Sequence, residues 1–136
     1  MFSLQQLFGK GDQFYALLVA SAEEALTSVQ LLIKLLQTSP KPNTLDDFVL
    51  SRRKDKRITE QISEELVKTF VTGLEREDIE SLSNALYKIP KTVEKFAERY
   101  QLSVGMVRDI DFTKQADMMG RAAEAVVAMV RQLNDL

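Results

Sequence analysis

The chain has 136 residues, of which 45% are hydrophobic and 28% are charged, a balance typical of a globular domain. It contains no cysteine and no histidine. This excludes a disulfide framework and a thiolate metal site, and it removes the commonest general base and zinc ligand. The formal charge of −2 gives no general attraction to nucleic acid. We therefore expect one domain, residues 1–136, without a catalytic centre.

The N-terminal residues 1–10 show no basic segment followed by a long apolar run, so the sequence predicts no signal peptide. No uninterrupted apolar stretch approaches the ~20 residues that span a bilayer. We expect a soluble, cytoplasmic protein with no membrane insertion.

The first predicted helix covers residues 12–37. Its apolar side chains recur at spacings of three and four residues from Phe14 to Leu36, which is the period of one continuous helix stripe. Pro40 and Pro42 are expected to end it, because proline cannot continue a helix.

The second predicted helix covers residues 44–71. Thr44, with an aspartate three residues later, resembles a capping box at its start. Its middle, residues 52–57, is strongly basic where the apolar stripe should continue. A second capping-box pattern at Thr72 predicts the turn that precedes the next helix.

Two further helices are predicted at residues 74–101 and 111–135, joined by a loop of about residues 102–110. Pro90 is expected to remove one backbone hydrogen bond and to bend the first of these helices. Gly120 and the alanines around it make one region of the last helix thin. Four long amphipathic helices with short connections predict an all-α, antiparallel four-helix bundle.

The basic run at residues 52–57 carries five cations and one anion, and Arg52 and Lys56 share a helix face. Three interpretations remain open for this run. It is a solvated surface, an anion or phosphate site that uses the forked geometry of arginine, or a nucleic-acid-binding surface, which the absence of interleaved aromatic residues disfavours. Lys88 and Lys91 form a second basic pair on the third predicted helix.

The segment at residues 63–79, SEELVKTFVTGLEREDI, closely resembles the signature EELNKTFITP(D/E)REDI of the PhoU-related phosphate transport regulators. The opening at residues 14–18, FYALL, is similar to FFELL of the same family, and the resemblance covers about residues 14–102. Gly73 replaces the usual proline of the family in a turn. The resemblance implies a PhoU-like helical bundle of two three-helix repeats, in relatives linked to low-affinity inorganic phosphate transporters.

The same resemblance implies clusters of iron or zinc, bound by the motifs E-x-x-x-D on one helix and D-D-x-x-D on the next. Carried over through the signature, the first motif falls on Arg52 and Lys56. The second falls on Tyr87, Lys88 and Lys91. Every expected carboxylate is absent, and ammonium and guanidinium groups offer no lone pair to a hard metal. We therefore predict that the metal site is abolished, and that the four cations receive negative charge from an acidic face of a second subunit or from phosphate.

Relatives continue through six helices, whereas this chain ends after its fourth predicted helix. The Ala- and Gly-rich face of that helix has two alternatives. It folds back onto the first three helices, or it pairs with the same element of another chain in a symmetric dimer, which is the alternative we favour.

Together these features predict a non-enzymatic, PhoU-like accessory or regulatory protein of inorganic phosphate transport, which acts by protein–protein contact through helical faces. The expected partners are a second copy, a phosphate transporter or an acidic PhoU-like protein, with no nucleic acid and no cofactor. Two alternatives remain. One is a small module that binds phosphate or polyphosphate on the basic cluster, and the other is a purely structural assembly module.

Overall fold

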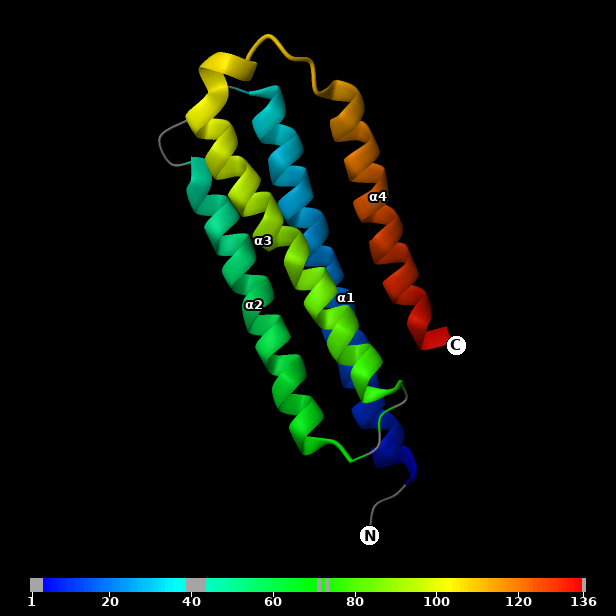
Figure 1. Cartoon of the computed structure of the whole chain (residues 1–136). Coiled ribbons are helices and arrows are strands. Elements are labelled where there is room, and N and C mark those ends of the chain that lie inside the picture. The colour runs from blue at the N-terminus through cyan, green and yellow to red at the C-terminus, as the bar shows by residue number, and fades with distance from the viewer. Residues whose placement is uncertain (1–3, 39–43, 71, 73, 136) are drawn as a thin grey trace.

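The computed structural model describes residues 4–38, 44–70, 72 and 74–135, with side chains from Gln13 onward. The predicted all-α fold is confirmed: the described residues form four long helices and no strand. The helices run alternately up and down the bundle (Figure 1). Their bounds are α1 Leu4–Gln37, α2 Thr44–Lys68, α3 Arg76–Val107 and α4 Thr113–Gln132, followed by the short 3₁₀ helix η1, Leu133–Asp135.

Helix α1 is the centre of the bundle. It packs against each of the other three helices, whereas in the described ranges the backbone of α4 lies close to α1 and η1 and not to α2 or α3. By length and composition the segment Gln13–Gln37 is apolar enough to cross a membrane, a property that the search for an uninterrupted apolar run did not identify. Part of this segment, 44% of its apolar window, is buried within the bundle, where α1 packs against three neighbouring helices.

The core forms two clusters along α1. Phe14 and Leu18 belong to the lower cluster, and Leu32 belongs to the upper one. The lower cluster also contains Ile62, Ile79, Leu86 and Val127, and the upper one also contains Phe48, Val93, Ala97 and Tyr100. Each cluster therefore draws side chains from all the helices, with α1 between them.

The helix bounds differ from the predicted ones most clearly at the end of α3. This helix continues to Val107, so the loop predicted at residues 102–110 is wrong for residues 102–107. Val104 and Val107 pack against the upper cluster, which explains why the helix continues beyond Tyr100. Helix α1 also begins earlier than predicted, at Leu4. Helix α2 ends at Lys68, so its predicted extension to residue 71 is wrong for residues 69 and 70, and residue 71 itself lies outside the described residues.

The turn between α2 and α3 is held by an arginine rather than by the capping box predicted at Thr72. Helix α3 begins after Glu75, whose side chain makes no capping hydrogen bond. The guanidinium group of Arg76 instead donates hydrogen bonds to three carbonyl oxygens at the end of α2 and just after it. These belong to Leu66, Thr69 and Phe70. A cation at the negative end of the α2 dipole is favourable.

The small-residue face of α4 is used within the chain. Ala116 and Ala123 are buried, and a Cβ atom added at Gly120 would stand 3.1 Å from Cδ1 of Ile33 on α1. This corresponds to the first of the two alternatives, in which the face folds back onto the preceding helices. Self-association itself stays a prediction.

Shortening a side chain at the centre of the lower cluster is expected to destabilise the fold. Leu18 is fully buried, so Leu18→Ala should lower the free energy of unfolding by about 2–5 kcal/mol through the cavity it leaves. Leu102→Ala is the matched control, because Leu102 is 88% exposed and its truncation should change stability by less than about 0.5 kcal/mol. Urea unfolding followed by circular dichroism measures both; equal losses would contradict the described packing.

Candidate functional site

Arg52, the first of the four predicted contact residues, is already paired within the chain. Its guanidinium group forms an ion pair with the carboxylate of Glu94, and the two side chains are only 25% and 12% exposed. A hydrogen bond with Tyr87 raises the pKa of Arg52, and Glu94 raises it further against the opposing effect of burial. Arg52 therefore fastens α2 to α3, and part of its guanidinium group is already used within the chain.

The other three predicted residues are exposed. Lys56 lies one helical turn from Arg52 on α2, while Lys88 and Lys91 lie on α3 beside Tyr87 and Glu94, the two residues that Arg52 contacts. Within the part of the chain that the structure describes, none of the three forms an ion pair. Three exposed lysines without an ion pair in the described residues therefore lie on the two helices that the Arg52–Glu94 contact joins.

The positions of the family metal motifs do not fit iron or zinc. Apart from the phenol oxygen of Tyr87, they offer only ammonium and guanidinium groups, which have no lone pair for a metal. Among the described residues, no group of three or more acidic, histidine or cysteine side chains is placed to hold a metal ion. A metal-dependent role at these positions is therefore not supported.

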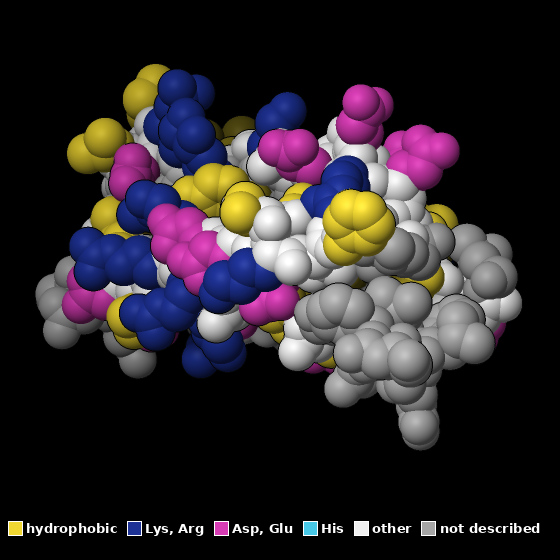
Figure 2. All heavy atoms as spheres, turned by 90° about the horizontal axis from the view of Figure 1, so that it is seen from below, with side chains coloured by type: hydrophobic (Ala, Val, Ile, Leu, Met, Phe, Trp, Pro, Cys, Tyr) yellow, Lys and Arg dark blue, Asp and Glu magenta, His cyan; other side chains and the backbone are white. Residues whose placement is uncertain are grey.

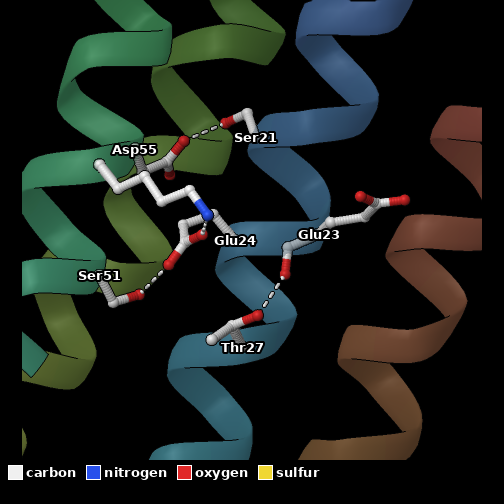
Figure 3. A network of polar contacts seen from close by, with 7 residues as sticks. Ser21, Glu23, Glu24, Thr27, Ser51 and Asp55 are labelled. Atoms are coloured by element: carbon white, nitrogen blue, oxygen red, sulfur yellow. Dashed lines mark hydrogen bonds and ion pairs between the residues drawn. The ribbon is translucent and has the colours of Figure 1, made fainter. Parts of the chain in front are cut away.

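A second polar group lies inside the bundle, between α1 and α2, and the sequence analysis missed it (Figure 3). The hydroxyl of Ser21 donates a hydrogen bond of 2.6 Å to Oδ1 of Asp55. One turn further along α1, the carboxylate of Glu24 accepts a hydrogen bond of 2.7 Å from Ser51. Nζ of Lys54 lies 3.3 Å from the other carboxylate oxygen of Glu24. Lys54 is therefore the counter-ion of Glu24.

The sequence did contain a signal for this group. Asp55 stands seven residues after Phe48 and seven before Ile62, and all three are buried. A spacing of seven keeps residues on nearly the same helix face. The basic residues around Asp55 indicated a charged surface. The spacing of Asp55 from two core residues of the same helix indicated instead that Asp55 is buried.

Burial sets the electrostatics of Asp55. Burial, with a smaller contribution from the charge of Glu24, raises the pKa of the carboxyl group to about 6 against the opposing effect of the hydrogen bond from Ser21. Oδ2 of Asp55 has no hydrogen-bond partner among the described residues. The group is enclosed by helices, so it can take up a proton near pH 6 but is not open to a substrate.

Compared with known proteins, the chain matches no family model, no curated protein and no solved structure. The resemblance to the PhoU-related regulators therefore stays a hypothesis that depends on the residues quoted for it.

The buried carboxyl group should make stability depend on pH. The pKa of Asp55 in the folded chain, about 6, lies above its usual value of 3.8, so between these values the folded state keeps a proton that the unfolded chain has lost. Its contribution to stability therefore falls as the pH rises through this interval, by about 3 kcal/mol in all from well below pH 4 to well above pH 6. Asp55→Asn removes this dependence.

The measurement is the free energy of unfolding of Asp55→Asn minus that of the unchanged chain, which should rise between pH 4 and pH 6 and stay constant above. Asp46→Asn, which removes an exposed carboxylate in the first turn of the same helix, is the control and should not reproduce this rise. Parallel stability curves for Asp55→Asn and the unchanged chain would contradict the buried position of this carboxyl group.

Proposed function

We propose that this chain is a non-enzymatic accessory protein that acts by protein–protein contact through the outer faces of α2 and α3. The resemblance to PhoU-related regulators favours inorganic phosphate transport as its setting. The observation that carries the proposal is the group of three exposed lysines, Lys56, Lys88 and Lys91, which lies beside an arginine already paired within the chain.

The helices that carry these lysines are held to their neighbours by polar contacts. Beneath them the Arg52–Glu94 ion pair joins α2 to α3, and the hydrogen bond of Ser21 to Asp55 joins α1 to α2. Seen from the lower end of the bundle, Lys and Arg side chains gather on one side of the molecule, with Asp and Glu side chains among them (Figure 2). Such a surface attracts an acidic partner and fixes its orientation through complementary charge.

Direct binding of phosphate is the second candidate, and the geometry favours it less. Arginine binds phosphate through its planar fork, but the guanidinium group of Arg52 is already paired with Glu94 through Nε. The remaining groups are lysines in contact with solvent, where salt screens their attraction for a small anion. A protein surface presents several carboxylates at once and suits three separated lysines better.

The proposal predicts a phenotype in phosphate uptake. In cells that lack the gene, uptake of radiolabelled phosphate should change, and the unchanged chain should restore it. A variant carrying Lys56→Glu, Lys88→Glu and Lys91→Glu should fail to restore most of the difference, because it repels an acidic partner. The control carries Lys34→Glu, Lys114→Glu and Arg121→Glu, three exposed cations elsewhere, and should restore uptake.

Full restoration by the first variant, or no effect of gene loss, would contradict the proposal. Thermal unfolding in inorganic phosphate and in sulfate at equal ionic strength separates the second candidate, since a ligand that binds only the folded state raises the melting temperature. If the lysines contact a protein and do not bind phosphate, the melting temperatures in phosphate and in sulfate should be equal. A rise specific to phosphate that the lysine variant loses would favour the anion-binding module instead.

A further inference from the structure

The outer face of α2 carries a regular stripe that the fold leaves uncovered. Its six side chains follow one another at intervals of three and four residues, and all are exposed, with Leu50 63% and Val67 88% accessible. They are Leu50, Arg53, Arg57, Glu60, Glu64 and Val67. This spacing is that of a coiled-coil contact, and the stripe lies opposite the buried face of α2. We call it the α2 stripe.

The charges along the α2 stripe follow one another in blocks of like sign. Two arginines are followed by two glutamates, with one apolar residue at each end. Arg53 and Arg57 are one helical turn apart, as are Glu60 and Glu64, and like charges at this spacing destabilise a helix. No ion pair within the described residues relieves these four charges.

We propose that the occupant of the α2 stripe is a second copy of this chain, bound in antiparallel orientation about a twofold axis beside Ile58 and Thr59. The axis places Arg53 opposite Glu64 of the partner subunit. It also places Arg57 opposite the partner's Glu60, and the symmetry repeats each contact. The inference rests on the proposed function, contact through the outer faces of α2 and α3, and names a second copy as the partner of the α2 face, beside the three lysines.

The same twofold axis also pairs the apolar residues at the two ends of the α2 stripe. Leu50 comes to lie opposite Val67 of the partner subunit, so an apolar contact closes the interface at each end. The two residues are separated by 17 positions, roughly 25 Å along a helix, which spans most of α2. Every member of the stripe thus has a complementary member related by one symmetry operation.

The charge order also selects the orientation. In a parallel dimer Arg53 would face Arg53 of the partner subunit, and each glutamate would face itself, which opposes association. The antiparallel dimer replaces each of these repulsions with an attraction. Solvent-exposed ion pairs are individually weak and are screened by salt, so the dimer should weaken as salt rises.

Sedimentation of the full chain over a range of concentrations tests the interface. The unchanged chain should dimerise at low salt and dissociate at high salt. A doubly acidic variant (Arg53→Glu with Arg57→Glu) and a doubly basic variant (Glu60→Arg with Glu64→Arg) should each be monomeric, because all four stripe charges become alike. Mixed in equal amounts they should form a heterodimer, since every opposed pair is then complementary again.

The control is Lys88→Glu with Lys91→Glu, the same change of charge on α3, which should leave dimerisation of the chain within about twofold. Circular dichroism of each variant verifies its helix content. If either charge-reversed variant fails to fold, Arg53→Gln with Arg57→Gln replaces the test and should weaken the dimer at least about tenfold.

Three results would overturn the proposal: a monomeric unchanged chain at every concentration, charge-reversed variants that dimerise like the unchanged chain, or folded variants whose mixture stays monomeric. The lysine variant of the preceding subsection keeps the two proposals apart. If the unchanged chain does not dimerise but the triple lysine variant still fails to restore phosphate uptake, only the α2 stripe proposal is refuted. If the chain dimerises as predicted but the triple lysine variant restores normal uptake, only the proposed function is refuted.

Discussion

The apolar surface of α1 has to be covered on several sides, and the arrangement of the other helices follows from this requirement. Helix α1 contributes side chains to both core clusters, and α2, α3 and α4 each pack against it. The hydrogen bond from Ser21 to Asp55 then sets how α2 meets α1, because a buried carboxyl group is tolerated only where it has a partner. Once the inner face of α2 is fixed, its outer face is fixed as well.

The consequence for function is a division of the charges on α2 between its two sides. Arg52 and Asp55 are used within the chain, in contacts with Glu94 and Ser21. The neighbouring charges at positions 53, 56 and 57 remain on the exposed surface. A run of charge that is continuous in the sequence is therefore two structural features in the folded chain. One holds the helices together, and the other is available to a partner.

The sequence predicted helices well where a single apolar stripe was present, and less well where local and tertiary interactions compete. The stripe from Phe14 to Leu36 correctly identified α1, and the basic character of Lys56, Lys88 and Lys91 correctly indicated exposed positions. The pairing of Arg52 was not predictable, because Glu94 is 42 residues away and only the packing of α2 on α3 brings them together.

The central claim is that the outer face of α2 meets another copy of the chain in antiparallel orientation. The chain has no cysteine, so single labels introduced at Gln61→Cys or Lys68→Cys report distances between subunits by pulsed electron spin resonance. The twofold axis predicts a short separation at position 61, within about 20 Å, and a longer one at position 68, roughly 30 Å from the helical rise alone. A shorter separation at position 68 than at position 61, or no coupling between subunits at either position, would contradict the account.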